Sequence, residues 1–408
     1  MQIRQTSFAF TLLPGLLAAV PYSGIDINLP ALAATGASLG RSASDVGLTM
    51  SAFMFSLAVA PLLYGSISDR LGRKPVIVFG LALFIAASLA CTIARSLLEL
   101  LIYRFTQGVG AASAAMTFAI IRDLFDEAVA RAKIGSVIVS TNVVTIISPT
   151  AGAALLSIGS WRLIYAIQAG IGTALLLAVF YGLAESVRLD PMKHPAPAAG
   201  VRSFLRVLTH RLSLAYILVD AAGGAEVFAY VTGCSLFFIG IVRSTAGQYG
   251  LILSACSVAV MSGALLDGYF GFYGVPARQV LTIGLSLLVA ASSTLLALTL
   301  TGCTPPALIA VLLMTVALAF GMTMPNILNA TLRSLPDIAG AVSAVVGSTQ
   351  VMAGAVSSGL VAILFDGRST LSMAAVIFMF AFIAYWQLAY PIECRISFAE
   401  THETRSNL

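Results

Sequence analysis

Charge is scarce in this chain. Of its 408 residues only 10% are Asp, Glu, Lys or Arg, where a typical soluble domain has about 25%. Hydrophobic residues make up 59%, and the mean hydropathy is +0.97. This composition excludes a soluble enzyme and a disordered chain. The 22 basic residues outnumber the 17 acidic ones, but they form no continuous basic stripe, which excludes a nucleic-acid binder.

Cysteine and histidine are also rare. The five cysteines are scattered through apolar segments without the paired spacing of a disulfide framework or a zinc site, so we interpret them as packing residues. The three histidines fall in polar segments. The sequence contains no nucleotide-binding loop, metal-ligand cluster or nucleophile constellation. We therefore expect neither an enzyme nor a cofactor.

Long apolar segments are abundant instead. We predict twelve transmembrane helices, because a span needs about 20 apolar residues. The first segment follows one arginine, as in a signal peptide, but no cleavage site follows it, and we expect it to be the first span. The predicted spans are residues 8–32, 45–66, 75–94, 98–121, 134–157, 162–184, 212–240, 246–271, 278–301, 305–329, 339–364 and 371–391.

The longest polar stretch, from Glu185 to Arg211, divides these spans into six and six. Its prolines indicate an irregular linker. We therefore expect a six-helix bundle at residues 1–186, a linker at 187–211, a second six-helix bundle at 212–394 and a tail at 395–408. With the N-terminus inside, sixteen Lys and Arg residues fall inside and five outside, the last of the 22 being Arg104 within a span. This bias predicts cytoplasmic termini and a cytoplasmic linker.

The two halves share a short motif. Gly65–Pro75 reads GSISDRLGRKP and Gly263–Gly268 reads GALLDG, so the spacing G-x-x-x-D recurs at an offset of 198 residues. Two related bundles around a midplane site are a common architecture of secondary transporters.

These motifs resemble those of a known family. Gly65–Pro75 is similar to the cytoplasmic signature loop of the major facilitator superfamily, and Arg104–Ala112 (RFTQGVGAA) resembles the span-4 motif of its drug–proton antiporters. Asp26–Leu32, Arg122–Asp123 and Trp161–Arg162 look like the bicyclomycin/chloramphenicol-resistance (Bcr/CflA) branch. The resemblance covers residues 20–390, nearly the whole chain. It departs in span 5, where Ser148 and Ala153 replace glycines of the antiporter motif.

The resemblance implies an all-α membrane fold, a monomer, and a cavity lined by spans 1, 4, 7 and 10. It also implies a latch that stabilises the outward-facing state, with Asp69 at its centre. The alternative for the basic residues of the loop is that they only fix the topology. The latch residues would be Gly65, Asp69, Arg70, Gly72 and Arg73, the glycines allowing close approach and positive φ.

Four ionisable residues lie inside predicted spans: Asp26, Arg104, Asp220 and Glu226. A charge in hydrocarbon is expensive, so such residues face a cavity or a partner. Asp26 and Arg104 lie at matching depths, ~9 and ~10 Å from the outer membrane face at 1.5 Å per residue. We predict that they form a pair, direct or through Gln107, whose rearrangement changes the proton affinity of Asp26. Each also has a structural alternative, as a cap or packing partner or as a hydrogen-bonding group.

Glu226 and Asp220 are further candidates for proton coupling. Glu226 lies near the midplane of span 7, with Tyr230 one turn later on the same face. It is either a second protonation site, a counter-ion for a cationic cargo, or a neutral acid bonded between helices. Asp220 is either functional or structural. Softer cavity candidates, which packing also explains, are Tyr22, Asn142, Asn326 and Gln350.

We therefore predict a proton-coupled secondary transporter of the bacterial inner membrane, which exports small amphiphilic drugs by alternating access. Its partners would be the cargo, protons and the lipid bilayer, and no nucleic acid. Three alternatives remain open: a dedicated exporter of a metabolite, nucleoside or siderophore; a proton-coupled importer; and a receptor or scaffold that does not transport.

Overall fold

The structure is a computed structural model that describes residues 8–387, except 126, 184, 186–204, 303 and 336–337. Every element in these ranges is helical, which confirms the predicted all-α class. The first half contains α1 (Phe8–Asp26), η1 (Leu29–Ala31), α2 (Leu32–Leu39), α3 (Ala43–Leu71), α4 (Arg73–Ile93), α5 (Leu97–Ala111), η2 (Ala112–Ala115), α6 (Met116–Leu124), α7 (Glu127–Ile158) and α8 (Trp161–Gly182). The second half contains α10 (Arg211–Ser235), η3 (Leu236–Ile241), α11 (Ala246–Phe272), α12 (Ala277–Leu300), α13 (Pro306–Ser334) and α14 (Ala339–Leu364).

Ten helical segments within the described residues are long and apolar enough to cross a membrane. Two predicted spans are not among them. Residues 98–121 fall on α5, η2 and α6, where a 3-10 turn interrupts the helix. Residues 371–391 begin with the shorter apolar helix Leu371–Gln387, and the rest lie outside the described residues. The count of twelve stays a prediction, as do the linker at 187–211, most of which is not described, and the cytoplasmic termini.

The first predicted span is interrupted near its end. The α-helical pattern stops at Asp26, and the chain passes through a turn and η1 before it continues as α2. Pro30 explains the break, because it has no backbone N–H to donate to the carbonyl of Asp26 four residues earlier. The side chain of Asn28 instead donates to the carbonyl of Gly24 at 2.8 Å. Asp26 is therefore the last residue of a broken helix.

The helices begin where side-chain caps are available. The backbone N–H of Asp45 donates to Ser42 Oγ at 3.1 Å, and the carboxylate of Asp45 accepts from the N–H of Ser42. This capping box satisfies two groups at the start of α3 that the helix leaves unpaired. Thr245 and Gln248 form the same arrangement at the start of α11.

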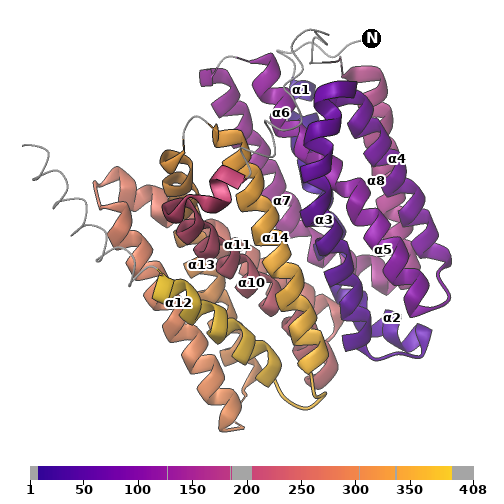
Figure 1. Ribbon diagram of the computed structural model, residues 1–408. Helices are drawn as coiled ribbons and strands as arrows, with labels where there is room; N and C mark the ends of the chain where they lie inside the picture. Colours follow the sequence, from indigo (N-terminus) through magenta and orange to yellow (C-terminus); the bar gives the residue numbers. More distant parts are fainter. Residues whose placement is uncertain are drawn as a thin grey trace, which may run out of the picture.

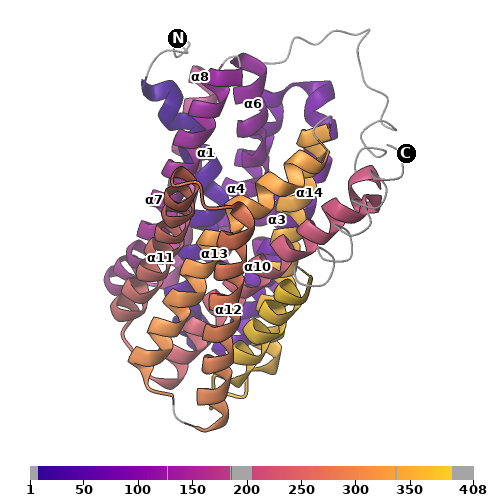
Figure 2. The same cartoon turned by 90° about the vertical axis from the view of Figure 1, so that its left-hand side faces the viewer.

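The helices form two groups that lie side by side (Figures 1 and 2). In the first half α1 packs on α7, α3 on α5, and α4 on α5 and α8. In the second half α10 packs on α14 and α13, while α13 also contacts α11 and α12. Two helix pairs join the halves, α3 with α14 and α7 with α11. The interface between the halves is therefore lined by four long helices.

Glycines allow several of these helices to approach closely. A Cβ atom on Gly321 of α13 would collide with the carbonyl oxygen of Val260 on α11. A Cβ on Gly347 of α14 would meet nothing within 4 Å. Small residues at such crossings favour close packing between membrane helices.

This difference predicts a matched pair of stability effects. Gly321→Ala must push α11 and α13 apart, and overpacking of this kind costs about 1–3 kcal/mol. We expect a clearly lower unfolding temperature for purified Gly321→Ala in detergent. Gly347→Ala is the control and should unfold at or above the wild-type temperature, because alanine favours the helix. Equal unfolding temperatures for the two variants would contradict the close crossing.

Candidate functional site

The two halves are held together at the end of the molecule opposite the N-terminus. Ser235 Oγ on α10 donates to the carbonyl of Leu29 at 3.1 Å, and Ser254 Oγ on α11 donates to the carbonyl of Ile146 at 2.6 Å. The hydroxyls of Thr150 and Ser254 lie 2.8 Å apart. Each contact pairs a residue of the first half with one of the second. We call this region the closed end.

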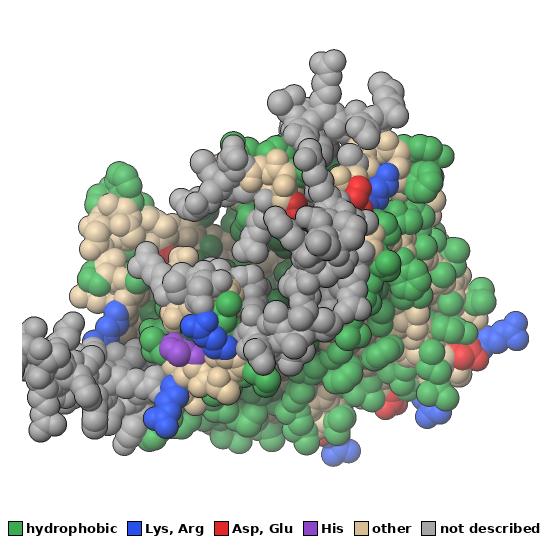
Figure 3. All heavy atoms as spheres, turned by 45° about the horizontal axis from the view of Figure 1, so that its top comes forward, with side chains coloured by type: hydrophobic (Ala, Val, Ile, Leu, Met, Phe, Trp, Pro, Cys, Tyr) green, Lys and Arg blue, Asp and Glu red, His purple; other side chains and the backbone are tan. Residues whose placement is uncertain are grey.

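Side-chain packing extends the closed end toward the middle of the molecule. A Cβ on Gly354 of α14 would meet both Phe228 of α10 and Met54 of α3. Figure 3 looks obliquely onto the other end, which carries the N-terminus, and shows a recess between the two halves. The structure is therefore closed at one end and hollowed at the other.

Asp26 lies at the break of α1. Its side chain is 9% exposed and has no hydrogen-bond or ion-pair partner among the described residues. Tyr22, one turn earlier, is 46% exposed. Two tyrosines of the second half, Tyr230 on α10 and Tyr249 on α11, lie within electrostatic range of Asp26. Asp26 is thus an unpaired carboxyl group beside both halves of the molecule.

Arg104 is the largest fully buried side chain, with 1% exposure. Its Nη1 donates to the carbonyl of Gly24 at 3.0 Å and to Gln107 Oε1 at 2.6 Å. The guanidinium carbon lies 4.3 Å from the centre of the Phe53 ring and 5.9 Å from that of Tyr165. Hydrogen bonds to neutral acceptors and aromatic faces therefore stabilise this charge.

The structure does not bring Arg104 and Asp26 into an ion pair within the described residues. Arg104 instead bonds a backbone carbonyl two residues before Asp26. Gln107 does not bridge them either, because its Nε2 donates to Ser88 Oγ and to Gln168 Oε1, both at 2.7 Å. The predicted exchange of partners during transport stays a prediction. In this conformation Arg104 positions the end of α1.

The two acids of α10 are more deeply buried than Asp26. Glu226 has 0% exposure, and neither of its carboxyl oxygens has a hydrogen-bond partner among the described residues. Asp220 has 1% exposure, and its Oδ1 accepts from Gln350 Nε2 at 3.4 Å. The sequence indicated Asp220 and Gln350 as separate candidates, and the structure shows a hydrogen bond between them.

Three predicted cavity residues have different surroundings. Tyr230 is 4% exposed on α10, and Asn142 is half-buried on α7. Asn326 Nδ2 on α13 donates to Asp267 Oδ1 and to the carbonyl of Met322. Asp267 is the second-half counterpart of Asp69 in the repeated motif. Asn326 thus has a bonding partner within its own half and need not contact cargo.

Sequence reasoning missed some residues of this region. Tyr249 is fully buried and near Asp26, and Gln168 of α8 completes the polar network of Arg104. For both residues, the signal available in the sequence was a polar side chain within an apolar predicted span. That signal does not show which helix faces which.

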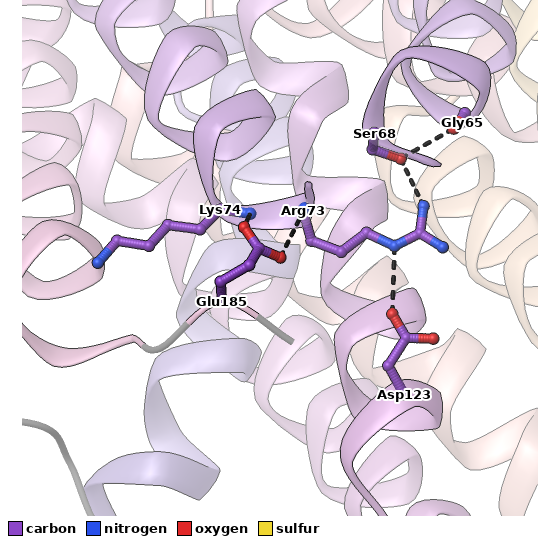
Figure 4. A network of polar contacts seen from close by, with 6 residues as sticks. All are labelled: Gly65, Ser68, Arg73, Lys74, Asp123 and Glu185. Atoms are coloured by element: carbon purple, nitrogen blue, oxygen red, sulfur yellow. Dashed lines mark hydrogen bonds and ion pairs between the residues drawn. The ribbon is translucent and has the colours of Figure 1, made fainter. Parts of the chain in front are cut away.

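The loop between α3 and α4 is tied to its own half (Figure 4). Glu185, after α8, accepts hydrogen bonds from the backbone N–H groups of Arg73 at 2.9 Å and Lys74 at 3.1 Å, which begin α4. Arg73 Nε pairs with Asp123 Oδ2 of α6 at 3.2 Å, and its Nη1 donates to Ser68 Oγ. A carboxylate at a helix start interacts favourably with the positive end of the helix dipole and with the unpaired backbone N–H groups there. These contacts connect α3, α4, α6 and the end of α8.

The predicted latch is only partly visible. Gly72 has φ +96°, the positive value that its type predicts, whereas Gly65 lies inside α3 and a Cβ on it would meet nothing within 4 Å. The side chains of Asp69 and Arg70 lie outside the described part of the structure. The latching role of the loop therefore stays a prediction.

Gly72 gives a testable consequence. Alanine at this φ is strained by about 1–3 kcal/mol, and its Cβ would lie 2.5 Å from Glu185 Oε2. We expect Gly72→Ala to lower the unfolding temperature of the purified protein. Gly65→Ala is the matched control and should leave that temperature unchanged or slightly higher. A Gly72→Ala protein as stable as the wild type would show that the cap by Glu185 does not hold α4.

Comparisons with known proteins identify the class. The family model of the Major Facilitator Superfamily matches residues 15–358, and the chain belongs to this superfamily. The bicyclomycin resistance protein homolog of Haemophilus influenzae is 26% identical over 373 residues, covering 89% of this chain and 91% of that protein. The multidrug resistance protein MdtL of Klebsiella pneumoniae is 28% identical over 361 residues, with coverages of 86% and 87%.

A solved structure supports the same fold. The crystal structure of a bacterial homolog of the human lysosomal transporter Spinster, in an inward-facing and unoccupied conformation, aligns with a TM-score of 0.72 and 16% identity, covering 94% of this chain and 96% of that one. The chain is therefore a multi-pass membrane transporter and not an enzyme.

Proposed function

We propose that this transporter exports small amphiphilic compounds in exchange for protons, by alternating access. It would do so as a monomer of twelve membrane helices in a bacterial inner membrane, with both termini in the cytoplasm. The observation that carries the proposal is Asp26, a carboxyl group with no partner in the described residues, located at a helix break between the two halves. Such a group can take up and release a proton without breaking a salt bridge.

The position of Asp26 couples it to the closed end. Leu29, three residues later, accepts the hydrogen bond of Ser235 that joins the halves. A change of charge on Asp26 acts close to this contact, because only the break at residues 27–28 lies between the end of α1 and Leu29. Protonation therefore has a direct structural route to opening the closed end.

Arg104 would support this coupling from within the first half. Its bond to the Gly24 carbonyl fixes the last turn of α1 from one side, and Asn28 bonds the same carbonyl from the other. The guanidinium stays protonated throughout the cycle. This permanent positive charge is bonded to the carbonyl of Gly24, two residues before Asp26 in the sequence.

The proposed cargo class rests on the relatives and on the aromatic residues near Asp26. Two relatives carry names that refer to bicyclomycin resistance and to multidrug resistance. Beside Asp26, Tyr22 is 46% exposed, and Tyr230 and Tyr249 of the second half are buried. Aromatic side chains with a few polar groups suit small amphiphiles.

The test uses everted membrane vesicles with an acidic interior and a pH-sensitive dye. We would add drugs, nucleosides and siderophores, with chloramphenicol as a neutral and ethidium as a cationic drug. Alkalinisation of the lumen by one compound, absent from vesicles without the protein, would establish proton-coupled export and the cargo class. Proton-independent transport, or uptake in intact cells driven by the gradient, would refute the proposal.

A further inference from the structure

Glu226 is the most completely isolated acid in the described structure. It has no exposed surface, and both of its oxygens lack a hydrogen-bond partner there. Asp26 and Asp220 differ from it, the first by its residual exposure and the second by its bond to Gln350. An ionised carboxylate in such a place would lack both water and a counter-charge, which is prohibitively expensive.

The elements around Glu226 supply no compensating charge. α10 packs against α14, α13, α11, η1 and η3. The only basic residues of these elements are Arg211 and Arg333, which lie at helix ends. The other ionisable groups are neutral or acidic: Tyr216, Asp220, Tyr230 and Cys234 on α10, and Tyr249, Cys256, Asp267 and Tyr269 on α11. These surroundings therefore favour the neutral form of the Glu226 side chain over the ionised one.

The helix that carries Glu226 also builds the closed end. Phe228, two residues later, and Met54 of the first half both lie against Gly354 of α14, and Ser235 bonds the carbonyl of Leu29. Opening the closed end must break these contacts and move α10 relative to the first half. α10 also contacts η1 of the first half, and Tyr230, one turn after Glu226 on the same face, lies near Asp26. The environment of Glu226 therefore differs between the two states of an alternating-access cycle.

From these observations we infer that Glu226 is a second proton-binding site, which holds its proton in this shielded conformation and exchanges it with water when α10 moves. The carboxylate takes up the proton from the outer side while the closed end is open. On the cytoplasmic side the O–H bond breaks and the proton passes to water, so protons move inward as cargo moves out. Asp26 and Glu226 together then move two protons per cycle. Export of a neutral compound would then move two charges per cycle, where Asp26 alone would move one. This inference rests on the proposed proton coupling.

The first test asks whether Glu226 carries a proton. Infrared spectroscopy of the purified protein at neutral pH should show the carbonyl stretch of a protonated acid without hydrogen bonds. We expect Glu226→Gln to lose this band and Glu99→Gln to keep it; Glu99 lies in the first turn of α5, where its carboxylate accepts from the backbone N–H of Arg95. Identical spectra for wild type and Glu226→Gln would overturn the inference.

The second test counts the protons without a known cargo. On a solid-supported membrane, a pH jump displaces charge as groups inside the transporter bind protons. We expect Glu226→Gln to displace about half the wild-type charge, while Glu99→Gln displaces all of it. An unchanged charge in Glu226→Gln, with a response in the wild type, would reject the second site and leave the proposed function intact. No displaced charge in the wild type would reject both.

A third variant separates this role from a structural one. Glu226→Leu removes an unsatisfied polar group and keeps a similar volume, so we expect a higher unfolding temperature together with the halved charge. A lower unfolding temperature in both Glu226→Leu and Glu226→Gln would show that the acid stabilises the bundle, and it would overturn the inference.

Discussion

Asp26→Asn abolishes proton-driven transport: lumenal alkalinisation falls to the level of vesicles that lack the protein. Asparagine has nearly the shape of a protonated aspartic acid but cannot exchange a proton. Among the described residues, the Asp26 side chain makes no hydrogen bond or ion pair that the substitution would break. We therefore expect normal expression and an unfolding temperature near that of the wild type. Full transport in Asp26→Asn would remove Asp26 from the mechanism.

A second assay makes this prediction specific. Because the variant mimics the protonated state, it should still exchange labelled for unlabelled cargo when no gradient is applied. Loss of both proton-driven transport and exchange would indicate damage to the cargo site. Glu99→Gln is the control for removal of a carboxylate, and it should transport as the wild type does.

The sequence predicted the class of the fold because a membrane imposes strong constraints. Every membrane span needs a long apolar segment, and such segments are visible without any knowledge of packing. The interruption at Asp26 was harder to predict. Pro30 was visible, but proline is tolerated in membrane helices, and whether the chain bends or breaks depends on what satisfies the freed carbonyls. Here Asn28 and Arg104 share the carbonyl of Gly24.

Contacts between buried polar residues could be predicted only partly. Matching depth made an Asp26–Arg104 pair reasonable, but depth does not determine which faces of two helices meet. Arg104 instead found a carbonyl, an amide and two aromatic rings. For Glu226, sequence position showed that the acid lies in the membrane. Its lack of a partner among the described residues depends on the side chains of the neighbouring helices.

The contacts of the closed end allow a direct test of alternating access. Thr150 and Ser254 lie on α7 and α11 with their hydroxyls 2.8 Å apart, so their Cβ atoms lie near the separation that a disulfide spans. We would introduce Thr150→Cys and Ser254→Cys in a chain with Cys303 and Cys394 replaced by serine. Oxidation should lower transport to background, and reduction should restore it, because a locked closed end cannot release cargo.

The structure offers a matched control for this lock. Thr299 and Thr370 have hydroxyls 2.7 Å apart, but both belong to the second half. A disulfide from Thr299→Cys and Thr370→Cys, confirmed by mass spectrometry, should leave transport unchanged because it does not cross the interface between the halves. Transport that continues with the Thr150–Ser254 pair fully oxidised would mean that this end never opens. The cycle proposed for Asp26 and Glu226 would then be wrong, since both acids depend on that opening to reach the opposite side of the membrane.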